Sequence, residues 1–160
     1  MTKLEDIKKE YEKISRIAKL PRFEDIDEMF EIRAIDLEKD GILLNAIVRR
    51  INNEINSYLS FLSLVANPSP NSLYSIVPLN YLDEKTKEEI TRHHAKLTMI
   101  YYSGLEILLM DEKGKIKFIQ DTCSFVKEFR NMLAKFVRAT AKAWESSSKE
   151  HNEKKWGFLP

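Results

Sequence analysis

Apolar residues recur along this chain at intervals of three and four, the spacing that places side chains on one face of an α-helix. The spacing predicts helices over residues 4–20, 23–40, 42–66, 84–110 and 116–149. Leu20-Pro21, Asp40-Gly41 and the proline-rich segment 67–71 mark the ends of the first three, and Asp83 is a good N-cap for the fourth. Residues 72–82 are apolar but contain Pro78, so we expect a buried connector or a short helical turn there.

The segment 42–66 has the clearest pattern of apolar and polar positions. Its apolar residues fit within an arc of about 120° on a helix: Leu44, Ile47, Val48, Ile51, Ile55, Tyr58, Leu59, Leu62 and Val65. Its polar residues occupy the other side: Asn45, Arg49, Asn52, Asn53, Asn56 and Ser60. We expect a helix that buries one face and exposes the opposite face.

The end of the fourth predicted helix is apolar on all sides. Nine of the twelve residues from Met99 to Met110 are apolar. Such a helix must be covered on every side, so it is either the central helix of the domain or part of an oligomer interface. The candidate partner-binding residues in this segment are Tyr101, Tyr102, Ile107, Leu109 and Met110.

These elements predict an all-α fold. Five helices, three of them long, joined by short connections, indicate an antiparallel helical bundle over residues 1–150. Residues 115–119 alternate briefly as a strand would, but they continue into the helical pattern without a break. Residues 151–160 lose the helical period, and we expect a C-terminal tail there.

The expected tail carries three large apolar side chains, Trp156, Phe158 and Leu159, directly after Lys154-Lys155. Each such side chain gains roughly 1.5–3 kcal/mol from burial. The tail therefore either folds back onto the bundle or docks into a partner, and the same three residues are candidate partner-binding residues.

The composition excludes several classes of protein. With 43% hydrophobic and 32% charged residues, the chain is too apolar for a disordered protein and too charged for a membrane protein. No stretch of 18 uncharged apolar residues occurs, and the first ten residues lack a secretory pattern. A single cysteine, Cys123, excludes an internal disulfide and is typical of a reducing compartment. We expect a cytoplasmic protein that has no membrane contact.

Positive charge is concentrated in residues 113–160, which hold 11 basic and 5 acidic side chains. This asymmetry indicates either an acidic or nucleic-acid partner or an attraction between parts of the same fold. Five basic residues of the last predicted helix share an arc of about 80° and span about 33 Å at 1.5 Å per residue. They are Lys127, Lys135, Arg138, Lys142 and Lys149, with Glu145 inside the same arc. The stripe is either a phosphate-binding surface or an ordinary lysine-rich face that meets solvent or acidic neighbours.

The residues that usually carry catalysis are present without a catalytic pattern. His93 and His94 diverge by about 100° on a helix, so they cannot easily share one metal ion. Instead, we expect His93 to pair with Glu89 and His94 to border the apolar face. Cys123 lies beside the apolar face of the last helix, which predicts a structural thiol. We expect no catalytic residue, no metal and no cofactor, although scattered carboxylates leave open a divalent-metal enzyme.

Two functions follow from these patterns. The first is a non-enzymatic helical subunit or adaptor of a larger intracellular assembly, acting through protein–protein contacts or as a homo-oligomer. The second is sequence-neutral nucleic-acid binding, alone or within a nucleoprotein complex, through the basic stripe. The two functions can coexist in one small subunit.

Overall fold

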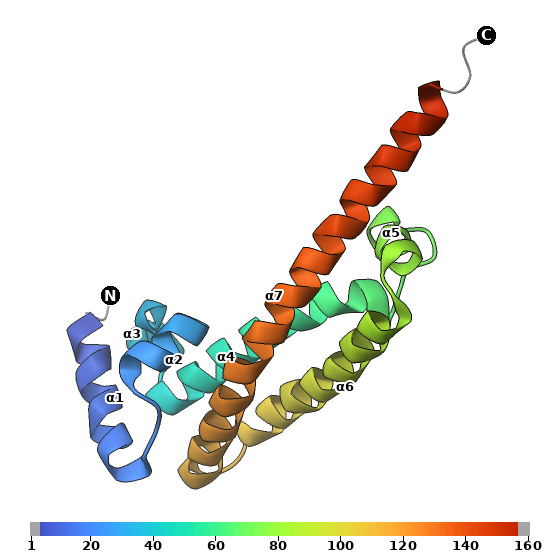
Figure 1. Ribbon diagram of the computed structural model, residues 1–160. Helices are drawn as coiled ribbons and strands as arrows, with labels where there is room; N and C mark the ends of the chain where they lie inside the picture. Colours follow the sequence, from blue (N-terminus) through green and yellow to red (C-terminus); the bar gives the residue numbers. More distant parts are fainter. Residues whose placement is uncertain (1–3, 157–160) are drawn as a thin grey trace. The chain divides into compact units, whose positions relative to one another are not determined.

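The computed structural model describes residues 4–156, with side chains described for residues 4–150. Over this range the chain is helical and forms no strand, which confirms the predicted all-α class (Figure 1). None of the helices in the described range combines the length and apolar content that a bilayer span requires. The predicted number of five helices is wrong, because the described residues form seven α-helices and one 3₁₀ helix, η1. They are α1 (Leu4–Ala18), α2 (Phe23–Phe30), η1 (Ile32–Ala34), α3 (Leu37–Asp40), α4 (Leu43–Ala66), α5 (Leu73–Tyr81), α6 (Glu84–Ile107) and α7 (Glu112–Trp156).

The helices are grouped in two compact units rather than in the single five-helix bundle that the sequence predicts. Unit 1 combines the chain up to Ser57 with Thr98–Phe129, and unit 2 combines Tyr58–Leu97 with the chain from Arg130 onward. Both units therefore contain parts of α4, α6 and α7. The boundary between a domain over 1–150 and a tail over 151–160 stays a prediction, although the α7 backbone continues to Trp156.

The predicted helix over residues 23–40 is divided, and Asp27 provides the physical reason. Its buried carboxylate accepts a hydrogen bond from the Arg33 backbone N–H at 2.8 Å and another from Arg33 Nε at 2.6 Å. Glu31, between them, adopts the left-handed conformation with φ of 51°. A carboxylate that holds a backbone N–H six residues later competes with helix continuation, so α2 ends there and η1 and α3 follow.

In unit 1, α4 buries the apolar face that its spacing predicts, including Leu44, Ile47 and Ile51. Asn52 is an exception, because it lies on the predicted polar face but is only 4% exposed. Its side chain meets Gly104 of α6 so closely that a Cβ atom at Gly104 would overlap the Asn52 carboxamide. The burial of Asn52 thus depends on a contact with a second helix. The spacing of apolar residues in α4 cannot predict such a contact.

Two hydrogen bonds hold the end of α1 and the segment after it, one within the N-terminal helices and one from α7. The Tyr11 hydroxyl donates to the Pro21 carbonyl at 2.6 Å, and the Gln120 amide of α7 donates to the Ala18 carbonyl at 2.7 Å. The core beneath them contains Ile7, Tyr11, Phe23, Ile26, Phe30, Ile32, Ile119, Val126 and Phe129.

In unit 2, the core contains one face each of α4, α6 and α7 together with buried residues of α5 and the segment after it: Tyr58, Leu62, Val65, Val77, Leu82, Ile90, Leu97, Phe136 and Ala143. Asp83 caps α6 as the sequence predicts, because its carboxylate accepts hydrogen bonds from the backbone N–H and the hydroxyl of Thr86. Residues 72–82, expected as a connector or a short turn, form α5, a helix of nine residues that contains Pro78.

Candidate interaction surfaces

An apolar strip is exposed along the end of α6 and the turn that follows it in unit 1. We call it the α6 strip. Its members and their exposed fractions are Met99 (73%), Tyr102 (65%), Leu105 (44%), Leu109 (89%) and Met110 (50%). At 100° per residue Met99, Tyr102 and Leu105 share an arc of about 120° on α6, and Leu109 and Met110 follow in the turn after Ile107. Exposed large apolar side chains that gather on a surface mark interaction sites.

The opposite side of α6 is covered, which explains why only part of the predicted partner-binding set is exposed. Gly104 is buried against Asn52 of α4. Tyr101 and Ile107 are half-buried, while Tyr102, Leu109 and Met110 are exposed. The Tyr101 ring contacts the Tyr102 ring with 5.7 Å between centroids.

The sequence-based selection missed Met99 and Leu105. The sequence could have indicated both, because positions 99, 102, 105 and 109 are separated by three or four residues, the spacing of one helical face. The predicted tail residues Phe158 and Leu159 and the side chain of Trp156 lie outside the described residues.

The predicted basic residues of α7 are all exposed, and they are divided between the two units. Lys127 belongs to unit 1, where its charge, after the larger effect of the Arg22 hydrogen bond, helps lower the pKa of Asp25. The other four belong to unit 2, and we call them the α7 basic row: Lys135, Arg138, Lys142 and Lys149. Within residues 4–150, no member of the row forms an ion pair.

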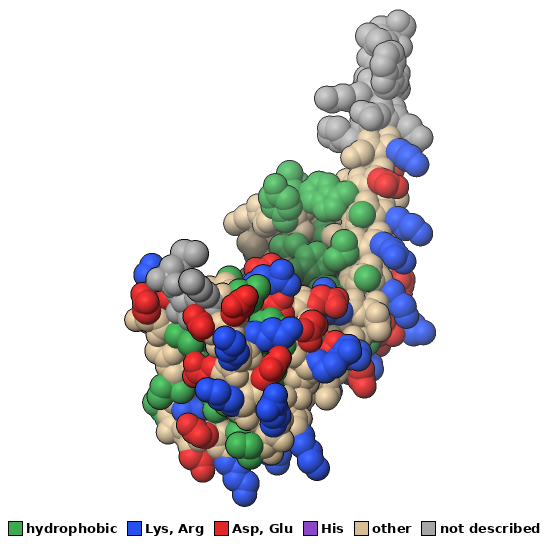
Figure 2. Space-filling view, turned by 90° about the vertical axis from the view of Figure 1, so that its left-hand side faces the viewer, with side chains coloured by type: hydrophobic (Ala, Val, Ile, Leu, Met, Phe, Trp, Pro, Cys, Tyr) green, Lys and Arg blue, Asp and Glu red, His purple; other side chains and the backbone are tan. Residues whose placement is uncertain are grey.

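Aromatic and apolar side chains flank the same stretch of α7. Tyr74 of α5 is 68% exposed and its ring lies 5.8 Å from the half-buried Trp144 ring, centroid to centroid. Leu73 and Val137 are also exposed. Figure 2 shows hydrophobic side chains gathered beside the upper part of α7, with Lys and Arg side chains along another edge of that helix. The sequence does not predict the exposure of Tyr74, because residues 72–82 show no regular spacing of apolar residues that would assign Tyr74 to a helical face.

The two adjacent histidines make separate structural contacts in unit 2. His93 Nδ1 lies 2.8 Å from the backbone carbonyl oxygen of Glu89, so the predicted partner is correct but the contact is not with the carboxylate. His94 Nε2 lies 3.0 Å from Ser63 Oγ, and the His93 ring meets the Phe136 ring edge-on. Among the described residues, no three His, Cys, Asp or Glu side chains are grouped closely enough to hold a metal ion.

Cys123 is buried in unit 1, and its surroundings hold the thiol in its protonated form. The side chain is 3% exposed, and this burial raises the pKa of the thiol to about 12. A nucleophilic cysteine needs the thiolate, which a raised pKa disfavours near neutral pH. The predicted structural role of Cys123 therefore agrees with its position.

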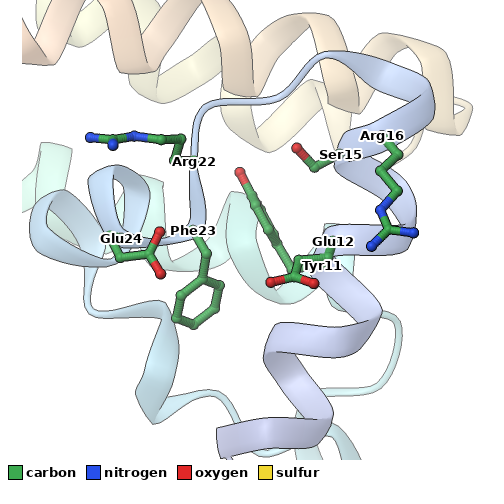
Figure 3. A pocket seen from close by; sticks show the side chains of 7 residues that line it. All are labelled: Tyr11, Glu12, Ser15, Arg16, Arg22, Phe23 and Glu24. Atoms are coloured by element: carbon green, nitrogen blue, oxygen red, sulfur yellow. The ribbon is translucent and has the colours of Figure 1, made fainter.

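A cleft of about 290 Å³ lies between α1 and the start of α2 in unit 1. Figure 3 shows the Tyr11 ring crossing it, with Arg22 and Phe23 on one side and Ser15 and Arg16 on the other. Arg22 is bound to Asp25, and Glu24, which also lines the cleft, is bound to Lys8. Arg22 and Glu24 therefore already have ion-pair partners within the chain. The cleft is a weaker candidate for ligand binding than the two exposed surfaces.

Comparison with protein-family models, with curated proteins and with solved structures found no match for this chain.

Proposed function

We propose that this chain is a non-enzymatic helical subunit that assembles through the α6 strip, with a second copy of itself as the partner. The observation that carries the proposal is the exposure of five large apolar side chains, 44% to 89% each, along the end of α6 and the turn after it. The buried state of Cys123 and the structural contacts of His93 and His94 support a role other than catalysis.

The size of the strip supports a pairing of two copies. The five exposed fractions amount to roughly 600 Å² per chain, at about 200 Å² for a large side chain. Two strips in contact would bury roughly 1,200 Å², the lower end of the range for specific protein interfaces. Glu106 is the one charged side chain within the arc that Met99, Tyr102 and Leu105 share, so the strip can face an identical apolar surface without a complementary charge on a different partner.

Light scattering after size exclusion tests the proposal over a range of protein concentrations. We expect a dimer that dissociates on dilution, and a monomer for Leu109→Glu up to about 200 µM protein. The reason is that a carboxylate in an apolar interface loses its hydration without gaining a partner. Ile17→Glu is the matched control, because Ile17 is 90% exposed and Leu109 is 89% exposed, and Ile17 lies on α1 outside the strip.

Two outcomes would overturn the proposal. The first is a wild-type chain that stays monomeric at about 200 µM. The second is a dimer that Ile17→Glu disrupts as strongly as Leu109→Glu, since the contact would then lie elsewhere.

A further inference from the structure

We propose that unit 2 binds single-stranded nucleic acid, with phosphates along the α7 basic row and bases stacked on the Tyr74–Trp144 pair. This inference goes beyond the proposed function, which concerns the α6 strip of unit 1. It rests on a juxtaposition that the structure describes within one unit: exposed cations that form no ion pair within residues 4–150, and an exposed aromatic ring beside the same helix.

The α7 basic row is suited to a chain of phosphates. From Lys135 to Lys149 it spans about 21 Å at 1.5 Å per residue. Because none of its members forms an ion pair within residues 4–150, a phosphate would displace only counterions and water. Glu145 lies among them, so the surface carries four positive charges and one negative charge.

The aromatic pair supplies the second element that single strands need. Bases in a single strand have open faces, and they stack on exposed aromatic rings with little regard to sequence. Tyr74 is 68% exposed, and Trp144 supports its ring from the α7 side.

Mostly small side chains line the arc of α7 between the aromatic pair and the α7 basic row. On α7, Trp144 and Arg138 are separated by about 120° around the helix axis. Between positions 134 and 148, the exposed residues in this arc are small at Ala134, Val137, Ala141 and Ser148, and Glu145 is the charged one, about 20° from Arg138. A base can therefore reach Tyr74 over these side chains while its phosphate stays beside Arg138.

A single strand fits this surface better than a duplex or an acidic protein does. A duplex hides its base faces, so it would contact the cations but leave Tyr74 in water. An acidic protein segment offers charge without the regular alternation of phosphate and open aromatic face. Either alternative predicts that removal of the Tyr74 ring has little effect, and this difference decides the test.

Fluorescence anisotropy of a fluorescein-labelled 20-nucleotide oligothymidine tests the proposal on the full chain. We expect saturable binding at about 50 mM salt and affinity that falls roughly 20- to 50-fold at 200 mM, for three or four phosphates neutralised on a single strand. No binding at low salt overturns the proposal. A duplex of the same length that binds as tightly as the single strand also overturns it.

Two pairs of variants locate the site. Tyr74→Ala should weaken binding about 5- to 100-fold, the range for loss of one stacked base. Its control, Ile17→Ala, removes a large apolar side chain that is 90% exposed on α1, outside both surfaces, and should leave affinity unchanged. Tyr74→Phe keeps the ring and should restore binding.

The second comparison uses two double variants that reverse charge. The first is Arg138→Glu with Lys142→Glu, within the α7 basic row. It should weaken binding more than 10-fold and lower the salt slope by about 1.4, because two phosphate contacts are lost. Lys113→Glu with Lys117→Glu makes the same change in net charge at the start of α7 in unit 1 and should have a small effect. Equal losses in both charge variants, or normal binding by Tyr74→Ala, would rule out the proposed site.

Discussion

Gly104 and Asn52 face each other inside unit 1, where α6 and α4 approach too closely for any larger side chain at position 104. The side-chain nitrogen and oxygen of Asn52 are buried and have no hydrogen-bond partner within the described residues. A buried amide in this state costs about 1–3 kcal/mol relative to a satisfied one. The contact therefore fixes how α6 lies on α4 and reduces the stability of unit 1.

Gly104→Ala should destabilise the chain by about 1–3 kcal/mol, because the added Cβ overlaps the Asn52 carboxamide in a packed interior. In an Asn52→Ala background the same change should cost much less, since space is available and alanine favours the helix over glycine. Urea denaturation of the wild type, both single variants and the double variant measures this coupling. Equal costs of Gly104→Ala in the two backgrounds would show that the two residues do not constrain each other.

Cys123 should make the stability of the chain sensitive to alkaline pH. Folding raises the pKa of its thiol from about 8.5 to about 12. A raised pKa means that the protonated thiol is favoured by folding. Its contribution is therefore complete below about pH 8.5, and is lost as pH rises toward 12, by at most about 1.4 kcal/mol per pH unit.

Denaturation at several pH values between 9 and 11 tests this expectation on the wild type and on Cys123→Ala. The variant should show a shallower loss of stability with pH. Tyr11 stays in both proteins and contributes to the remaining slope, because its pKa is raised mainly by burial and only secondarily by the charge of Cys123. Parallel slopes would show that the thiol is not protected by folding.

At the scale of elements, the most consequential local feature is the end of α2. The Asp27 carboxylate binds both the backbone and the guanidinium of Arg33, and it does so from a buried position. One residue therefore ends a helix and fixes the direction of the chain toward α4.

Asp27→Ala should lower the free energy of unfolding by about 1–3 kcal/mol, because the Arg33 N–H loses its acceptor. Asp27→Asn keeps an oxygen in the same place and should lose less. The matched control is Asp25→Ala, which removes an exposed pair with Arg22 and should change stability little. Thermal or urea unfolding measures all three, and a loss from Asp25→Ala equal to that from Asp27→Ala would contradict the role of Asp27.

The sequence predicted the elements that depend on spacing alone. The apolar face of α4 and the cap of α6 at Asp83 follow from residues within one helix or one turn. The division at Asp27, the burial of Asn52 and the position of Tyr74 beside Trp144 each require a second segment. Periodicity does not contain such contacts. It therefore predicts which side chains are exposed where the helix face alone decides this, and it fails where a second helix covers that face.

At the scale of the whole molecule, the two candidate surfaces belong to different units. The α6 strip lies in unit 1, and the α7 basic row with Tyr74 lies in unit 2. Substitutions at exposed residues that share no partner are expected to act independently.

Leu109→Glu should therefore abolish self-association and leave the affinity for the 20-nucleotide probe within about twofold of the wild type, as additivity requires. Arg138→Glu with Lys142→Glu should do the reverse. Light scattering and anisotropy on the same samples measure both properties. Loss of both properties in either variant would show that the surfaces are one site or that the fold has been damaged.

Each unit is assembled from two separate stretches of chain, and each contains a natural reporter group. Cys123 belongs to unit 1, and Trp144 belongs to unit 2. In a Trp156→Phe background, the rate of thiol labelling reports the opening of unit 1, and Trp144 emission reports that of unit 2. Because α4, α6 and α7 run through both units, equal rates would mean that the chain opens as one cooperative body. Unequal rates would identify the unit that opens first.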